Sequence, residues 1–276
     1  MISVVILTLN EELNLPRCLE AISWCDDVLI VDSFSSDATL KIAGEHGARV
    51  LQRTFDNFAG QRNFALDHCE LKYEWIFHLD ADEVMTADLS AEILRCIAAT
   101  DKDAYRVSSK LMFHGKFLRH AGLFPWYQVR LGRRGKLRFT QVGHGQREQQ
   151  LPSHAIGTLK NSLLHFPFEK GLEDWIEKHN RYSTAEARQN VYGYADDDFP
   201  VLDLLSNATD RRRRAAKKIF RRFPCRTGIR FIYMYLLRGG ILDGKAGFMY
   251  CRLLTWYEWL IVLKEREIRA RARDKT

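Results

Sequence analysis

The sequence lacks the marks of a disulfide-stapled, secreted or membrane-spanning protein. Its six cysteines are scattered and contain no Cys-x-x-Cys pair, which favours reduced, buried thiols in a cytosolic chain. No run of about 18 consecutive apolar residues occurs, so no simple transmembrane helix is expected. The opening residues, MISVVILTLNEE, have no basic n-region and reach two carboxylates, which predicts a first core strand rather than a signal peptide.

Internal repeats and low-complexity linkers are also missing. What is present is an ordinary globular composition, with 276 residues of which 46% are hydrophobic and 28% charged, enough for a sizeable core. Basic residues outnumber acidic ones, and the formal net charge is +7. This charge suits an acidic partner, which is nucleic acid, anionic lipid or a phosphorylated substrate.

Apolar runs alternate with helix-forming segments in the amino-terminal third of the chain. The predicted strands are 2–9, 28–31, 48–52 and 75–79, and the predicted helices are 10–21, a segment opening at Ser36 or Asp37 as its N-cap, and 58–68. Such alternation favours right-handed βαβ units and an α/β fold with a mainly parallel sheet. Ligands of these sheets bind beyond the carboxyl ends of the strands. The polar residues at those ends are Thr8, Asn10, Asp32, Asp80 and Asp82.

The pattern changes after about residue 105. Strand-like pieces at 104–108, 127–131 and 159–165 are separated by glycine, proline and basic loops, and 172–190 is a predicted helix. From about residue 207 the chain is helical in pattern, basic and aromatic. We therefore expect one α/β domain over residues 1–200 and a basic amphipathic helical region over 201–276.

An acidic motif, His78-Leu79-Asp80-Ala81-Asp82-Glu83, follows the fourth predicted strand directly. Two carboxylates at positions i and i+2, where a buried strand ends, can converge on one Mg²⁺ or Mn²⁺ ion, which prefers oxygen ligands and often retains substrate phosphates. The alternative is an ordinary solvated turn, because Asp-x-Asp pairs are common there. The rigid strand before the motif favours the metal site.

Four motifs occur in order: VVILTLNEE, VDSFSSDAT, QRNFAL and HLDADE. Together they resemble the family-2 glycosyltransferases, and within that family the lipopolysaccharide-core β-1,4-glucosyltransferase branch. The resemblance continues more loosely through YQVRLGRRGKLRF, LLHFPF and GGILDGKAGFMY. It implies a GT-A-type, Rossmann-like, mainly parallel sheet flanked by helices, with the basic helical segment as a carboxy-terminal extension.

The resemblance also implies roles for individual residues. The implied nucleotide-binding residues are Thr8, Leu9, Asn10, Glu11, Asp32, Ser33, Asp37, Gln61, Arg62, Asn63, Asp80 and Ala81. The implied ligands of Mg²⁺ or Mn²⁺ are Asp82, Asp80 and His165. Plainer readings stay open, in which Asp32 and Asp37 cap a turn and a helix and His165 is a core histidine.

An inverting transferase needs a base to deprotonate the acceptor hydroxyl. The resembled enzymes are inverting and place His-Glu soon after the segment that matches 127–139. Here that stretch reads Val-Gly-His-Gly-Gln-Arg-Glu over 142–148, with Gly145 where the glutamate is expected. Either Glu148 or His144 is the base, and we slightly favour Glu148. The alternative is a surface glutamate paired with Arg147.

The acceptor side is less defined. Trp126 and Tyr127 are candidates to stack on a sugar face or to pack in the core, and Arg130, Arg133 and Arg134 are candidates to pair with a phosphorylated acceptor. The segment 207–226 holds nine Lys or Arg and one acidic residue, and aromatic helices follow it. This favours a peripheral contact with an anionic membrane surface over simple packing on the catalytic domain or on a second subunit of a homo-oligomer.

Three other functions compete with this one. A basic nucleic-acid-binding protein fits the charge, but no RNA-recognition, helix-turn-helix or zinc spacing is present, so no nucleic acid partner is expected. A sugar nucleotidyltransferase would favour a Gly-rich, Lys-bearing loop, which TLNEE does not provide. A binding-only remnant would follow if the base was lost at Gly145.

The combined expectation is a metal-dependent inverting hexosyltransferase. It would move a hexose from a nucleoside diphosphate sugar, preferably a UDP-sugar, to a lipid-linked saccharide in cell-surface polysaccharide or lipopolysaccharide assembly. It would act peripherally at the cytoplasmic face of the inner membrane.

Overall fold

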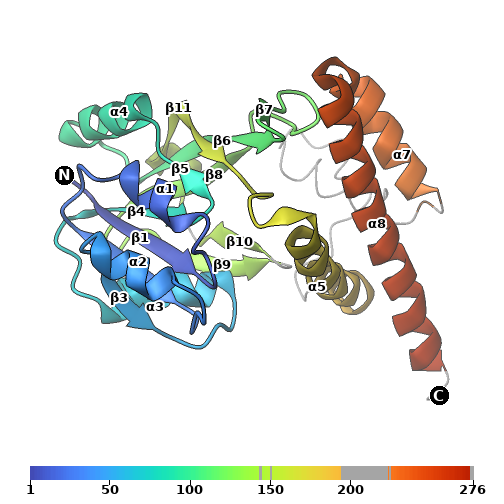
Figure 1. Ribbon diagram of the computed structural model, residues 1–276, viewed down its shortest axis with the longest axis horizontal. Helices are drawn as coiled ribbons and strands as arrows, with labels where there is room; N and C mark the ends of the chain where they lie inside the picture. Colours follow the sequence, from blue (N-terminus) through green and yellow to red (C-terminus); the bar gives the residue numbers. More distant parts are fainter. Residues whose placement is uncertain (143–144, 150, 194–222, 224, 274–276) are drawn as a thin grey trace. The chain divides into compact units, whose positions relative to one another are not determined.

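The computed structural model describes residues 1–142, 145–149, 151–193, 223 and 225–273. These residues form two compact units, Met1–Trp175 and Ile176–Thr276 (Figure 1). The division falls within helix α5 (Gly171–Tyr192). The boundary expected near residue 200 lies outside the described residues and stays a prediction.

Unit 1 is built on a nine-stranded mixed sheet in which most strands run the same way (Figure 1). Its parallel half has the order β3-β2-β1-β4, from β1 (Ser3–Thr8), β2 (Val28–Asp32), β3 (Arg49–Gln52) and β4 (Trp75–Asp80). Beyond β4 lie β8 (Tyr127–Arg133), β6 (Ala104–Phe113), β11 (Ile156–His165) and β5 (Glu83–Val84), and β7 (Lys116–Phe117) pairs with β6. β8 is antiparallel to both β4 and β6, whereas β11 is parallel to β6. The expected mainly parallel α/β sheet is therefore confirmed.

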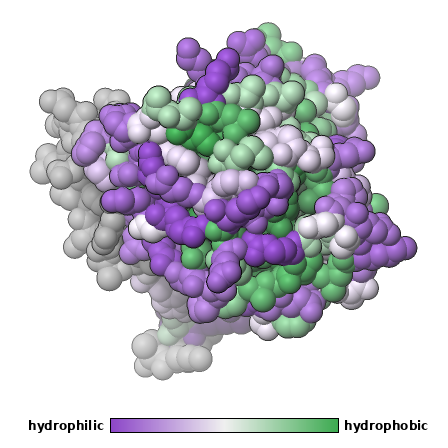
Figure 2. Space-filling model, turned by 90° about the vertical axis from the view of Figure 1, so that its left-hand side faces the viewer, coloured by the Kyte–Doolittle hydropathy of each residue, from purple (hydrophilic) through white to green (hydrophobic). Residues whose placement is uncertain are grey.

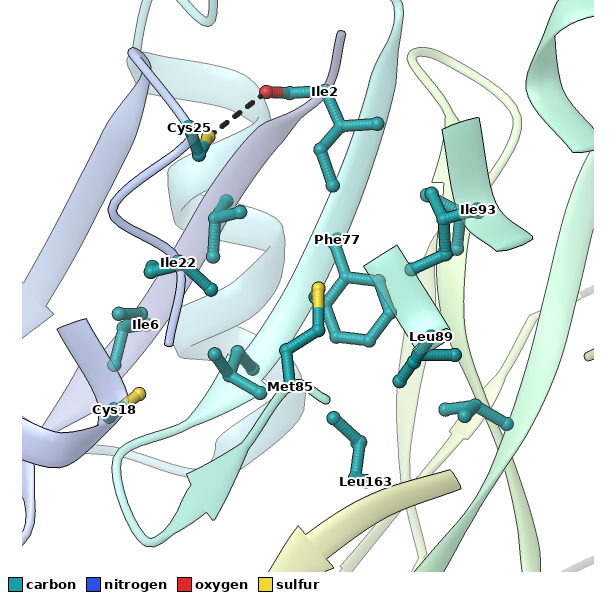
Figure 3. Packing of buried hydrophobic residues seen from close by; sticks show 14 of the residues in the cluster. Ile2, Ile6, Cys18, Ile22, Cys25, Phe77, Met85, Leu89, Ile93 and Leu163 are labelled. Atoms are coloured by element: carbon teal, nitrogen blue, oxygen red, sulfur yellow. Dashed lines mark hydrogen bonds between the residues drawn. The ribbon is translucent and has the colours of Figure 1, made fainter. Parts of the chain in front are cut away.

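Helices cover both faces of this sheet. Helices α1 (Leu15–Glu20), α2 (Thr39–Glu45) and α4 (Ala87–Ala98) share one hydrophobic cluster with alternate residues of β1 and β4, while α3 (Phe58–His68) packs on the other face. Figure 3 shows Phe77 and Met85 packed in the first cluster beside Leu89. Val4 belongs to the first cluster and Val5 to the second, because successive side chains of a strand point to opposite faces of the sheet.

Outside the sheet, a short hairpin joins β9 (Phe139–Val142) to β10 (Gly145–Glu148), and a 3₁₀ turn, η1, spans Ser153–Ala155. Hydrophilic residues are spread among smaller hydrophobic areas on the side of unit 1 that carries α2, α4 and β3 (Figure 2).

Two predicted helix starts are wrong. The first helix begins at Leu15 rather than Asn10, because Asn10 has a left-handed φ of 54° and Pro16 occupies the first helical turn. The second begins at Thr39 with Ala38 as its N-cap, so neither Ser36 nor Asp37 has that position. The Asp37 carboxylate instead accepts the backbone N–H and the hydroxyl of Thr39, two residues further on.

Unit 2 is helical, as expected for this part of the chain. It contains most of α5, then α7 (Arg226–Ile232), the π-helical turn η3 (Tyr233–Leu237), the 3₁₀ turn η4 (Gly240–Asp243) and α8 (Gly244–Arg273). Ala187, Tyr257 and Ile261 form its small core. Arg226 is buried there and pairs with Glu258 and Glu265 at 2.9 and 2.7 Å. Among the described residues, no helix is long and apolar enough to cross a membrane.

Candidate functional site

Three strands of the parallel half end in polar side chains at one edge of the sheet. Thr8 of β1 lies in register with Asp32 of β2, and Leu7 lies in register with Asp80 of β4. Because these strands are parallel, their carboxyl ends meet, and the loops that follow them enclose one region. The sequence predicted this arrangement, and it brings the candidate residues of three separate motifs together.

The loops after β1 and β2 are tied to each other through Asp32. This carboxylate is fully buried, accepts the Thr8 hydroxyl at 2.9 Å, and accepts the backbone N–H of Ser35 at 2.9 Å. Asn10 donates its own N–H to the Ser35 hydroxyl and accepts the Ser36 N–H on its side-chain oxygen, both at 2.8 Å. Asp32 also accepts the Ser35 hydroxyl and the side-chain amide of Gln52, so each of its two oxygens already accepts two hydrogen bonds within the protein.

Glu11 links this region to the chain that follows β11. Its backbone N–H donates to the Thr39 hydroxyl, and its carboxylate lies 2.8 Å from Lys170 Nζ. Burial raises the pKa of Glu11, although hydrogen bonds from Asn14 and Lys170 act in the opposite direction. Lys170 also donates to the carbonyl of Asn10 at 3.2 Å, so this lysine holds the loop after β1. The side chain of Leu9, which precedes Asn10 in that loop, is exposed.

Helix α3 supplies side chains that hold neighbouring loops in place. Gln61 is buried and donates to the Ser33 hydroxyl at 3.1 Å. Asn63 forms two hydrogen bonds with the backbone of Phe139, at 2.8 and 3.0 Å. Asn63 therefore positions the β9–β10 hairpin, and its amide is committed to the protein.

Asp80 lies between two buried arginines. One of its oxygens is 2.5 Å from Arg62 and the other is 2.7 Å from Arg130, and the Asp80 backbone N–H donates to Glu83. Burial would raise the pKa of Asp80, but the charges of Arg130 and Arg62 outweigh it and hold that pKa far below its usual value. Burial lowers the pKa of Arg62 to about 10. Arg130 also pairs with Glu83 at 3.1 Å, so it is a buried structural cation and not a surface contact for a phosphorylated acceptor.

Asp82, the second aspartate of the acidic motif, pairs with His165 at the same edge of the sheet. Asp82 Oδ2 lies 3.3 Å from His165 Nε2, and the Asp82 carbonyl accepts the N–H of Phe166. Burial lowers the pKa of His165, but the charge of Asp82 and its hydrogen bond outweigh that and raise it above the usual value. Ala81, between the two aspartates, is buried in the core cluster.

The donor set fits a divalent cation only in part. Two donors about 3 Å apart can share one ion: the carboxylate oxygen suits Mg²⁺ or Mn²⁺, and the imidazole nitrogen can join it once His165 has lost its proton. The structure brings Asp82 and His165 together in this way, whereas both oxygens of Asp80 face arginines. The described residues contain no group of three His, Cys, Asp or Glu that could hold a metal ion. Other ligands would have to come from the substrate phosphates and from water.

The candidate base Glu148 lies at the base of the hairpin. It pairs in register with Phe139, so the two side chains share the face of the hairpin that packs on α3, together with Gln146 and Gln141. Arg147 lies on the opposite, exposed face, which argues against the reading of Glu148 as a glutamate paired with this neighbour. His144 lies outside the described residues, so the choice between the two bases stays open.

Sequence reasoning missed the roles of Arg130 and Lys170. A signal for Arg130 was available, because it stands between Val129 and Leu131 in β8 and a buried strand position rarely carries a charge without a partner. Lys170 gave no such signal, since a lysine before a helix is usually solvated and its partner Glu11 lies far away in the sequence.

Replacing Arg130 with methionine should lower the free energy of unfolding by on the order of 3 kcal/mol, because it leaves Glu83 and part of Asp80 buried without their cation. Urea unfolding followed by circular dichroism measures this effect. Arg138→Met is the matched control: it removes an exposed pair with Asp67 and should change stability by less than about 1 kcal/mol. Equal midpoints for Arg130→Met and the wild type would contradict the role given to Arg130.

The sheet order and the acidic site at its carboxyl edge define an α/β protein of the GT-A class. The profile of Glycosyl transferase family 2 matches residues 3–147, more than half of the chain. The chain is also 32% identical over 198 residues to the lipopolysaccharide core biosynthesis glycosyltransferase LpsC of Rhizobium meliloti strain 1021, covering 69% of this chain and 72% of that protein. The chain therefore belongs to glycosyl transferase family 2.

Two solved structures are also similar. S. aureus TarS 1-349 in complex with UDP-GlcNAc is 14% identical, with a TM-score of 0.46 over 98% of this chain and 91% of that chain. Glucosyl-3-phosphoglycerate synthase from Mycobacterium tuberculosis, solved with Mn²⁺ and UDP-glucose, is 21% identical, with a TM-score of 0.34 over 40% of this chain and 43% of that chain.

Proposed function

We propose that this glycosyltransferase moves a hexose, with inversion, from a UDP-sugar to a saccharide on a lipid carrier. The observation that carries the proposal is the meeting of the Asp82–His165 pair with the loops after β1 and β2 at one edge of the sheet. Family membership supplies the reaction class, and the similarity to LpsC supports a role in lipopolysaccharide core assembly.

The donor would be held by the carboxyl edge of the sheet. Asp32 would accept a base N–H, and the loop from Leu9 to Glu11, fixed by Lys170, would seat the nucleotide. Asp82 and His165 would hold Mg²⁺ or Mn²⁺. When bound, the cation would neutralise the diphosphate leaving group.

The acceptor would approach from the hairpin side. Its hydroxyl would lose a proton to Glu148 or His144 as its oxygen bonds to the anomeric carbon, while the bond to the diphosphate breaks and UDP leaves. Trp126 is exposed at the amino end of β8, which lies beside the carboxyl end of β4 because the two strands are antiparallel. Its ring is therefore available to stack on an acceptor sugar.

An acceptor of this kind would require the enzyme to work at a membrane. A saccharide on a lipid carrier is reached only from a bilayer surface, and the net charge of +7 favours an anionic one. We accordingly propose a peripheral enzyme at the cytoplasmic face of the inner membrane.

Calorimetric titration of UDP tests the donor site. We expect UDP to bind in Mn²⁺ and to bind at least about tenfold more weakly in EDTA, because a cation held by Asp82 and His165 would offset the negative charge of the diphosphate. Analysis of the released product then separates the candidate reactions: a nucleoside diphosphate supports sugar transfer, and pyrophosphate indicates a nucleotidyltransferase. Failure of every nucleotide to bind would overturn the proposal.

A further inference from the structure

An exposed aliphatic surface lies at the turn between η3 and α8 in unit 2. Leu236 and Leu237 are 55% and 75% exposed, and Ile241 and Leu242 are 50% and 71% exposed. We call these four residues the aliphatic tip. Isolated exposed leucines are common on soluble proteins, but four aliphatic side chains within seven residues form a patch that calls for a partner.

The geometry of the turn forces these side chains outward. Gly239 has a left-handed φ of 75°, which reverses the chain within a few residues. A Cβ on Gly247 would lie 2.2 Å from the carbonyl oxygen of Gly240, so the turn and the first part of α8 are in backbone contact there. Met234 and Cys251 fill the inside of the turn. A Cβ on Gly240 would lie 2.8 Å from the Met234 carbonyl oxygen and 3.1 Å from Cys251 Sγ, so the inside of the turn is closely packed and the four aliphatic side chains lie outside it.

The charges around the tip have one sign. Over residues 226–257 the single acidic side chain, Asp243, is buried, whereas Arg238, Lys245 and Arg252 are exposed. An apolar tip with exposed cations before and after it in the chain is complementary to a bilayer that contains anionic lipid, since the cations can stay at the headgroups while the aliphatic groups enter the acyl region. In a two-fold contact with a second copy of this chain, the same cations would face each other and repel.

We propose that the aliphatic tip inserts into an anionic bilayer and anchors this protein on it. The proposal deepens the proposed function, because a lipid-borne acceptor requires such an anchor. It places the anchor in residues 236–242. The sequence suggested a membrane contact for the whole basic and aromatic region 201–276, and the proposal narrows the inserting part to these seven residues. Each buried methylene adds to membrane affinity, so two polar replacements at the tip should weaken binding by roughly tenfold or more.

Vesicle flotation tests this anchor. The full chain is mixed with vesicles of phosphatidylethanolamine and phosphatidylglycerol, or of phosphatidylcholine alone, and floated at low salt and at 1 M salt. The tip variant is Leu237→Asn with Leu242→Asn, both highly exposed in the native structure. The matched control is Tyr192→Asn with Leu263→Asn, two exposed positions in unit 2, the second of them 19 residues after Gly244 on α8.

We expect the wild type and the control to float with the anionic vesicles and the tip variant to remain largely unbound. Some wild-type binding should survive at 1 M salt, because screening removes the charge attraction but not the apolar insertion. Equal flotation of the tip variant and the wild type would overturn the proposal. So would a wild-type dimer that the tip variant converts to monomer without any change in flotation, which would identify the tip as a subunit interface.

The UDP titration is run on the same two variants. Normal UDP binding by a tip variant that fails to float supports the anchor and leaves the donor site intact. If the wild type floats but binds no nucleotide, the proposed function fails while the anchor stands.

Discussion

Replacing Asp82 with asparagine is expected to abolish metal-dependent UDP binding and to lower turnover by at least about 1,000-fold, which corresponds to about 4 kcal/mol of transition-state stabilisation. Asparagine keeps the size of the side chain and removes the charge that attracts a cation. The Asp82 side chain is partly exposed and asparagine has nearly its shape, so the fold should persist. Calorimetry with UDP and Mn²⁺ and steady-state kinetics measure the two effects.

Asp101→Asn is the control, because Asp101 is an exposed carboxylate of the same unit that pairs only weakly with the adjacent Lys102. It should bind UDP and turn over as the wild type does. His165→Asn should fall between the two, since it removes the second donor but leaves the charge of Asp82. If Asp82→Asn bound UDP normally in Mn²⁺, the cation would have to be held elsewhere or not be required.

The parallel half of the sheet could be predicted closely from sequence, and for a physical reason. β1, β2 and β4 are buried on both faces, so each is a short, nearly continuous apolar run that ends in a polar residue. The second half was harder. The predicted strand at 159–165 begins earlier, at Ile156, because the polar and glycine residues at its start pair with β6 through backbone bonds that leave no apolar pattern.

The predicted helix starts were wrong for a similar reason. Residues 10–14 have helix-compatible composition, yet Asn10 adopts a left-handed φ and bonds to the loop after β2. That competing partner lies about 25 residues away, and no local propensity registers it. The helix α4 and the β9–β10 hairpin were not predicted at all.

The candidate site shows the same division between local and distant information. The sequence predicted that Asp32, Asp80 and Asp82 follow strand ends at one edge of the sheet, and the structure confirms that position. What each carboxylate does there depends on partners from remote segments. Asp80 and Asp82 are two positions apart in the sequence, but Asp80 pairs with Arg62 and Arg130 while Asp82 contacts His165. Because these partners come from α3, β8 and β11, the sequence motif alone could not show that Asp80 pairs with two arginines whereas Asp82 lies beside a histidine.

The same reasoning bears on the base, where we expect Glu148→Gln to lower the turnover number by about 100-fold or more without weakening UDP binding. Glutamine preserves the shape of the side chain and cannot take the acceptor proton. Glu148 is the cross-strand partner of Phe139, and both side chains lie on the hairpin face that packs on α3. Two hydrogen bonds from Asn63 of α3 to the Phe139 backbone hold this strand pair in place. A carboxylate on a fixed hairpin can be held ready for an incoming hydroxyl, whereas one on its outer face would be solvated.

His144→Asn and Glu173→Gln complete the design. Glu173 is an exposed glutamate at the start of α5, and its replacement should leave turnover unchanged. If His144→Asn loses turnover and Glu148→Gln does not, the histidine is the base and Gly145 has replaced a glutamate that the reaction does without. If neither variant loses turnover while UDP still binds, proton abstraction must fall to another group, and the assignment of the hairpin to catalysis fails. Glu148→Asp adds a graded test, because a carboxylate set back by one methylene should recover part of the turnover only if Glu148 itself takes the proton.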